Sequence, residues 1–315
     1  MVALRRPDEL PPPPEDGLPT RPIKAHTQHK LHYWGCYLEA ASTATKHIFS
    51  RGRVCVDLFA GFGVCTDRTS GERCWGSALL SLQVVSPFDL YVFNDVNPEA
   101  TRVLAERARI HAGAVVFEID LDDPDVLRRA REIREVAVAS RPKVVVSTGN
   151  ANVMHVVLKE LSPMGKRYTC AVIDPQSAIY EWRAFEGLAY RERALDVMVL
   201  FPDAMDLQRG LPWYLRDGGG QKLDLCFGQH ASETWRNVAR ENAHAASALR
   251  ALYEEQMRKL IGLEVGRPRT VWRAGTDVPL YRLIFGSRSK RGITIWDDIC
   301  RRSRDEQIEL PLDGL

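Results

Sequence analysis

One acidic residue and two glycines lie within one short segment of this sequence, residues 57–63. Asp57 lies in an apolar run that favours a β-strand, and Phe59, Ala60, Gly61 and Gly63 follow it. Glycines at this place let the chain turn sharply and bring backbone N–H groups close to a ligand. A dinucleotide fingerprint needs a third glycine at position 66, where this chain has threonine. The segment therefore predicts a nucleotide-binding turn of another kind, and its alternative role is a tight turn whose small residues serve packing.

A second acid stands at the end of the next predicted strand. Asp95 follows residues 90–93, and in a Rossmann-like sheet an acid at this place accepts hydrogen bonds from both ribose hydroxyls. Its alternative role is to cap the helix that follows. An acid before the glycines is the pattern of class I methyltransferases, where Asp57 would help orient the amino-acid portion of the cofactor. Asp57, Gly61, Gly63 and Asp95 together predict a site for S-adenosylmethionine.

Asp174 and Pro175 directly follow a predicted strand at residues 169–173. Proline holds the preceding residue extended, which aims the Asp174 carboxylate and carbonyl into the cleft. Amino-directed nucleic-acid methyltransferases place Asp/Asn-Pro-Pro-aromatic here, where the polar group accepts from the target amine and the aromatic ring stacks on a flipped base. This chain continues with Gln176 and Ser177, so the second proline and the aromatic residue are missing. Asp174 and Pro175 are candidate catalytic residues, with a loop cap as the other role of Asp174.

Two segments compete for the position nearest the adenine. Asp120 follows one predicted strand, whereas Asn150 and Asn152 follow another. Residues 115–138 have the pattern of an extra strand-helix unit, which favours Asn150 and Asn152 over Asp120.

The elements that must position these residues alternate between strands and helices. Strands are predicted at residues 54–59, 90–93, 115–119, 144–147, 169–173 and 197–201, with helices of ten to fifteen residues between most of them. This alternation predicts βαβ units and a parallel sheet covered on both faces. Residues 269–273 and 280–285 predict an antiparallel finish. The expected fold is α/β, a Rossmann-like doubly wound, mostly parallel sheet with an antiparallel C-terminal strand pair.

Six segments follow from these patterns and from the turn residues. We expect a disordered Pro-rich tail at residues 1–24, a helix packing on the core at 25–50, and a Rossmann-like core at 51–202. An irregular insert or lid is expected at 203–230, a long helix with closing strands at 231–302, and a C-terminal tail at 303–315.

Composition excludes several other classes. The net charge of +2 does not indicate a wholesale polyanion-binding surface, and none of the seven cysteines forms a C-x-x-C pair. No apolar run reaches the ~20 residues of a transmembrane helix, so we expect a cytoplasmic protein with reduced thiols and no membrane contact. The cluster of His26, His29, Lys30 and His32 lacks a carboxylate or cysteine at ligand spacing. It favours a basic helix face or a phosphate contact over a metal site.

The motifs in this order resemble the three-Cys-motif partner proteins (TcmP), over about residues 25–300. Members of that family carry a lysine-bearing N-terminal helix, an Asp-x-Phe-Ala-Gly-x-Gly turn, a Gly-Asp/Asn-x-Asn turn and an Asp-Pro-aromatic-Gly motif. The matching positions here are His29-Lys30, residues 57–63, 76–79 and 149–152, Asp174-Pro175, residues 201–202 and Arg209. The chain departs from the family at Gln176-Ser177 and at Asn150.

The resemblance implies a class I methyltransferase-like fold and a radical-SAM-like partner protein bearing three cysteines. It also implies substrate-binding roles for His29, Lys30 and Arg209. The favoured function is S-adenosylmethionine-dependent methyl transfer, with nucleic acid as the preferred acceptor. The alternatives are a non-catalytic or cofactor-binding module that serves the partner, and a nuclease-like enzyme on the same fold.

Overall fold

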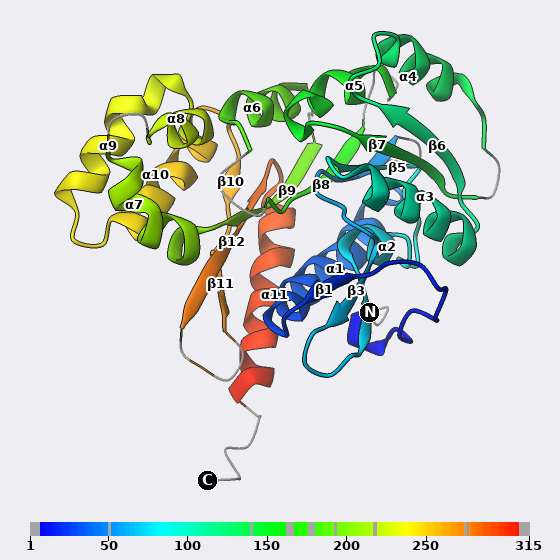
Figure 1. Ribbon diagram of the computed structural model, residues 1–315, viewed down its shortest axis with the longest axis horizontal. Coiled ribbons are helices and arrows are strands. Elements are labelled where there is room, and N and C mark those ends of the chain that lie inside the picture. The colour runs from blue at the N-terminus through cyan, green and yellow to red at the C-terminus, as the bar shows by residue number, and fades with distance from the viewer. Residues whose placement is uncertain are drawn as a thin grey trace.

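A nine-stranded sheet forms the centre of the molecule (Figure 1). The computed structural model describes residues 7–49, 52–138, 141–161, 167–175, 180–191, 194–216, 219–273, 276 and 278–308. Along the sheet the strands follow the order β10-β12-β9-β8-β2-β5-β7-β6, and β11 also pairs with β12. Their bounds are β2 (Arg53–Asp57), β5 (Leu90–Asp95), β6 (Val115–Asp120), β7 (Lys143–Thr148), β8 (Tyr168–Ile173), β9 (Ala194–Phe201), β10 (Glu264–Val265), β11 (Arg269–Trp272) and β12 (Pro279–Ser287).

The pairing directions confirm the predicted fold class. All pairs from β6 across to β9 are parallel, whereas β12 is antiparallel to β9 and both β10 and β11 are antiparallel to β12. The sheet is therefore Rossmann-like, doubly wound and mostly parallel, with an antiparallel C-terminal strand pair. β6, from the segment expected to be an extra strand-helix unit, is an edge strand beyond β7.

Helices cover both faces of the sheet. Alternate side chains of a strand point to opposite faces, so the buried strands contribute to one core on each face. Val54 and Val56 join one core cluster and Cys55 joins the other. The first cluster includes side chains from α4 (Val126–Glu135), α5 (Met154–Leu161), α6 (Trp182–Arg191), α8 (Gln221–Phe227), α9 (Ser232–Glu241) and α10 (Ala245–Lys259). The second includes side chains from α1 (His26–Thr45), α2 (Ser77–Ser81), α3 (Pro98–Ala112) and α11 (Lys290–Ile308). Figure 1 shows α7 to α10 gathered at one end of the molecule and α3, α4 and β6 at the other.

The segment after the core is helical, which corrects the expectation of an irregular insert at residues 203–230. It contains a π-helical turn (Asp203–Leu207), α7 (Gln208–Tyr214), α8 and a short 3-10 turn (Gln229–Ala231). Leu207, Tyr214 and Phe227 are buried in the core, so apolar contacts hold this part of the chain in place. The long helix expected within residues 231–302 is two helices, α9 and α10, with Asn242 extended between them. α11 runs to Ile308, into the expected tail, and residues 309–315 lie outside the described residues.

The N-terminal segment differs most from what the sequence predicted. Residues 7–24 contain a 3-10 turn (Pro7–Glu9) and a strand, β1 (Arg21–Ile23), instead of the expected disordered tail. β1 pairs in parallel with β3 (Val64–Asp67), which pairs antiparallel with β4 (Arg73–Trp75). The polar stretch after the glycine turn is therefore a hairpin that supports the N-terminal segment. Of the described helices, none combines the length and the apolar composition that a membrane crossing requires.

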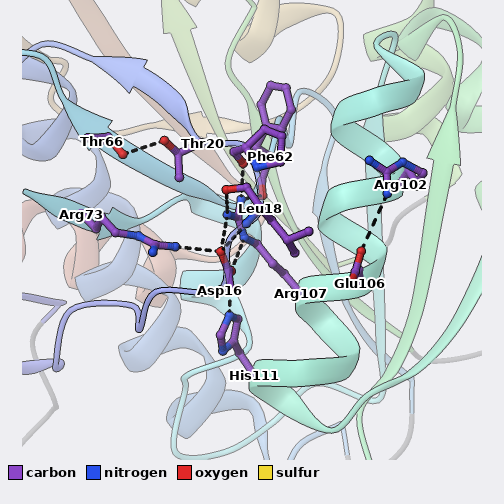
Figure 2. Close-up of polar contacts among 11 residues, drawn as sticks. Asp16, Leu18, Thr20, Phe62, Thr66, Arg73, Arg102, Glu106, Arg107 and His111 are labelled. Atoms are coloured by element: carbon purple, nitrogen blue, oxygen red, sulfur yellow. Dashed lines mark hydrogen bonds and ion pairs between the residues drawn. The ribbon is translucent and has the colours of Figure 1, made fainter. Parts of the chain in front are cut away.

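A buried ion pair fastens this N-terminal segment to α3 (Figure 2). Arg107 is fully buried, and its Nε and Nη2 donate to the two carboxylate oxygens of Asp16 at 2.8 and 3.0 Å. The guanidinium also donates to the carbonyls of Leu18, Pro19 and Phe62. All five donors of the arginine are thus used. The Arg107 hydrogen bonds hold the pKa of Asp16 well below its usual range.

Asp16→Asn is expected to lower the free energy of unfolding by about 3 kcal/mol, because it leaves the Arg107 charge buried without a counter-ion. Asp16 has a depressed pKa in the folded state, so its contribution is present above about pH 4 and is lost as the pH falls further. Denaturant titrations from pH 2 to 7 measure both effects.

Glu106→Gln is the control, because it breaks only the exposed pair with Arg102 on the same helix. This change should cost less than about 0.5 kcal/mol. Equal losses of unfolding free energy in the two variants would mean that the buried pair matters no more for stability than the exposed one.

Candidate functional site

A cavity of about 600 Å³, here called the strand-end cavity, opens where β2, β5, β7 and β8 end. Its volume lies within the range of small-molecule sites. Predicted site residues from four separate segments line it together: Phe59, Gly61, Asp95, Asn150, Asn152 and Asp174. Ligands in open α/β sheets bind at this edge, outside the carboxyl ends of the parallel strands.

Asp95 connects the glycine turn to the start of α3. Its Oδ2 accepts from the Gly61 N–H at 2.8 Å, and its Oδ1 accepts from the Asn97 N–H at 2.9 Å. Asn97 in turn caps α3, because its side chain accepts from the Glu99 and Ala100 N–H groups. A carboxylate has about four lone-pair sites, so Asp95 keeps acceptor capacity toward the cavity.

Asn94 ties three strand ends together, a role that the sequence analysis did not assign. Its buried Nδ2 donates to the carbonyls of Leu58 at 3.3 Å and Gly149 at 3.2 Å. Its Oδ1 accepts from the Ser147 hydroxyl at 2.9 Å, and its carbonyl accepts from the Ala60 N–H at 2.8 Å. A polar amide next to the acid at the strand end was the available signal, but its partners lie up to 55 residues away.

The two glycines of the turn differ in their surroundings. Gly61 has a φ of +58° and lines both the strand-end cavity and its neighbour. Gly63 has a φ of +76°, and a Cβ there would lie 2.7 Å from the Leu104 Cδ1 and 2.9 Å from the Leu79 side chain. The packing role therefore applies to Gly63, whereas Gly61 is the glycine that lines both cavities. The chain continues into β3 after this turn rather than directly into a helix.

Asp57 lies beneath the turn and lines neither cavity. Its Oδ1 accepts from the Phe59 N–H at 3.1 Å, and its buried Oδ2 has no hydrogen-bond partner among the described residues. Burial raises the pKa of Asp57 to about 7, while Ser77 and the Phe59 N–H act in the opposite direction. An unpartnered carboxylate oxygen below the glycine turn suits a cationic ligand, which would favour its ionised form.

The turn after β7, and not the end of β6, reaches the strand-end cavity. Asn150 and Asn152 line it, because β7 lies directly beside β5, whereas Asp120 ends the outer strand and does not line it. Asp120 instead accepts from the Asp122 N–H in its own turn. At the mouth of the cavity Val96 is 74% exposed, an apolar surface next to Asp95 that a ligand ring can cover.

Lys30 from α1 forms an ion pair with the carboxylate of Asp174 at the end of β8. Both side chains are largely buried, at 18% and 15% exposed. They line a second cavity of about 200 Å³, here called the basic cavity, which also contains Ala60, Gly61 and Gly63 in its wall. Asp174 and Arg21 line both cavities, so they lie at the junction between the two spaces.

The remaining predicted residues lie elsewhere. His29 lines a separate groove beside the proline-rich N-terminal segment, and Arg209 is exposed on α7 and lines neither cavity. Pro175 is buried directly after Asp174, and Gln176 and Ser177 fall outside the described residues. Within the described ranges, no three His, Cys, Asp or Glu side chains converge as a metal site would need.

Comparisons with known proteins give only distant likenesses. No family model matches the sequence, and no curated protein matches it. Protein LPL1258 from Legionella pneumophila str. Philadelphia 1, of the family model DUF519, is 8% identical over 86% of this chain and 90% of its own, with a TM-score of 0.43. Trm5b from Pyrococcus abyssi is 13% identical over 80% of this chain and 48% of its own, with a TM-score of 0.33. Trm1 from Pyrococcus horikoshii, solved with S-adenosyl-L-methionine, is 12% identical over 92% of this chain and 64% of its own, with a TM-score of 0.42.

Asp57→Asn is expected to raise the free energy of unfolding at pH 8 by roughly 2–4 kcal/mol, because it removes a buried charge. In the wild type the folded carboxyl holds a proton between about pH 4 and 7 that the unfolded chain releases. Stability from this group therefore falls as the pH rises through that range, and the variant should lose that slope. Urea titrations from pH 4 to 8 measure it, and an unchanged slope would rule out the raised pKa.

Proposed function

We propose that this protein binds S-adenosylmethionine in the strand-end cavity and acts as a methyltransferase. The observation that carries the proposal is the convergence of Gly61, Asp95, Asn150 and Asn152 from three adjacent parallel strand ends on one cavity. Each of these residues was expected at a cofactor site from sequence pattern alone. Gly61 follows β2, Asp95 ends β5, and Asn150 and Asn152 lie in the turn after β7.

The residues present fit the parts of that cofactor. The unused acceptor capacity of Asp95 suits the ribose hydroxyls. The exposed Val96 and the small Ala151 offer apolar contacts to the adenine ring, with Asn150 beside it for the ring nitrogens. Asp57 is buried below the turn, and the cationic end of the cofactor nearby would favour the ionised form of its carboxyl.

S-adenosylmethionine supplies an electrophilic methyl group on a positively charged sulfur. The protein then has to position an acceptor in line with that methyl group and exclude water, which is mainly an orientational task. Asp174 lies between the two cavities, where its carboxylate can accept a hydrogen bond from an attacking amine. The ion pair with Lys30 fixes the direction of that carboxylate.

Nucleic acid is the acceptor class that we propose, supported by the Asp174-Pro175 run at the strand end. A radical-SAM-like protein bearing three cysteines is the proposed partner, on the resemblance to TcmP proteins alone. His29 and Arg209, which that resemblance assigns to substrate binding, would contact an acceptor large enough to extend beyond the two cavities.

A second candidate function is a cofactor-binding module without turnover. The observation that favours it is the Lys30–Asp174 ion pair, which already occupies the carboxylate that an acceptor would need. Transfer of labelled methyl from S-adenosylmethionine to RNA or DNA separates the two functions, since a module binds the cofactor and transfers nothing.

Asp95→Ala is expected to weaken binding of S-adenosylmethionine by about 1–3 kcal/mol, through the lost charged hydrogen bonds to the ribose. Asp120→Ala is the matched control, because it removes an equivalent acid from the end of the neighbouring edge strand, outside the cavity. Calorimetric titration measures both. Equal affinity in the wild type and Asp95→Ala removes Asp95 from the site, and no binding to the wild type at millimolar ligand rejects the proposed function.

Asp174→Ala is expected to leave cofactor affinity nearly intact while lowering methyl transfer about 100-fold, because the acceptor loses its hydrogen-bond acceptor. Asp174→Asn serves as the comparison, since it keeps the shape and removes the charge that Lys30 pairs with. Single-turnover transfer of labelled methyl and calorimetry give the two quantities. Parallel loss of affinity and transfer would make Asp174 a structural residue.

A further inference from the structure

We propose that the basic cavity binds a phosphate group of the acceptor. Four cationic side chains line it, Arg21, Lys24, Lys30 and Arg68, against the single carboxylate of Asp174. Lys30 already pairs with Asp174, so the other three cations set the charge of the space. This inference rests on the proposed function, because it names the chemical class of the acceptor.

The three remaining cations have no carboxylate partner among the described residues. Arg107 and Arg73, by contrast, both donate to Asp16 a short distance along the same N-terminal segment. Unpaired cations that line one small, solvent-open space repel one another, and a bound anion removes that cost. Arginine is well suited to this, since its planar fork binds two phosphate oxygens at once.

The fold holds Arg21 at this place before any ligand arrives. Parallel pairing of β1 with β3 sets Arg21 opposite Cys65 and leaves its side chain against the glycine turn, where a Cβ on Gly61 would lie 3.7 Å from the Arg21 Nη1. The Thr20 and Thr66 hydroxyls hydrogen bond at 2.6 Å, and the Asp16–Arg107 pair anchors the chain five residues earlier (Figure 2). A preorganised cation loses less conformational entropy when it binds.

The two adjoining cavities differ in charge in a way that suits two different ligands. Asp95 and Asp174 are the acids of the strand-end cavity, with Arg21 as its only cation among the described lining residues, which suits a cationic cofactor. The basic cavity has the opposite balance, which suits an anion. Its volume of about 200 Å³ is below the usual range for whole drug-sized ligands and fits a small group such as phosphate. A phosphate held there places the rest of the acceptor beside Asp174, at the junction.

The test is the double variant Lys24→Gln/Arg68→Gln, because both residues are exposed and line the basic cavity only. Arg102→Gln is the control, since it removes an exposed cation from the outer face of α3 (Figure 2). Binding of inorganic pyrophosphate and of a short oligoribonucleotide is measured by calorimetry and fluorescence anisotropy at fixed salt, and S-adenosylmethionine binding is measured separately. We expect the double variant to lose about tenfold or more in affinity for the phosphate probes, with cofactor affinity unchanged and the control like wild type.

The two probes distinguish the source of the phosphate. Binding of both indicates a nucleic-acid acceptor, whereas binding of pyrophosphate alone indicates a small phosphorylated molecule, and either result supports the phosphate site. Wild-type protein that binds neither probe, or a double variant that binds both as tightly as wild type, overturns the inference. Loss of the proposed function would show instead as absent cofactor binding with phosphate binding intact.

Discussion

The buried carboxamide of Asn94 is the contact on which the geometry of the strand-end cavity depends. Its two donors and its oxygen are used by the ends of β2 and β7, while its own strand, β5, carries Asp95 as the next residue. A polar group left unsatisfied in this interior would cost more than a typical hydrogen bond contributes, so the three turns are held in one arrangement. Asp95 and the Gly61 turn face the cavity because Asn94 fixes the backbone on either side of them.

The Asp16–Arg107 pair holds the segment that forms one wall of the basic cavity in place, as Asn94 holds the turns around the strand-end cavity. A buried pair of this kind contributes little net stability compared with apolar packing, but it determines where a segment lies. Here it holds a segment with few apolar side chains against α3, so that β1 can add Arg21 to the wall of both cavities. The N-terminal segment is therefore part of the site even though its own composition cannot form a core.

The parallel core was predictable because its strands are buried on both faces and read as continuous apolar runs between helical patterns. The antiparallel β11 and β12 followed from the same patterns, whereas the sequence marked residues 115–138 only as an extra unit and did not place β6 at the edge of the sheet. The N-terminal segment was not predictable, because its order depends on Arg107 and on the β3–β4 hairpin, both far along the chain. The helices at 203–231 were missed for a related reason. Pro212 and the glycines at 218–220 are breakers by local rule, yet burial of Leu207, Tyr214 and Phe227 holds that segment helical.

The sheet, the turn at residues 57–63 and the acids and amides that follow the strands could be predicted, because they depend on short patterns with a fixed period. Which of those polar residues meet depends on the assembled fold. Strand order brought Asn150 and Asn152 to Asp95 and left Asp120 outside, and packing of α1 on the sheet brought Lys30 to Asp174 across 144 residues. Adjacency between strands and the satisfaction of buried charges are properties of the assembled fold, and no local pattern contains them.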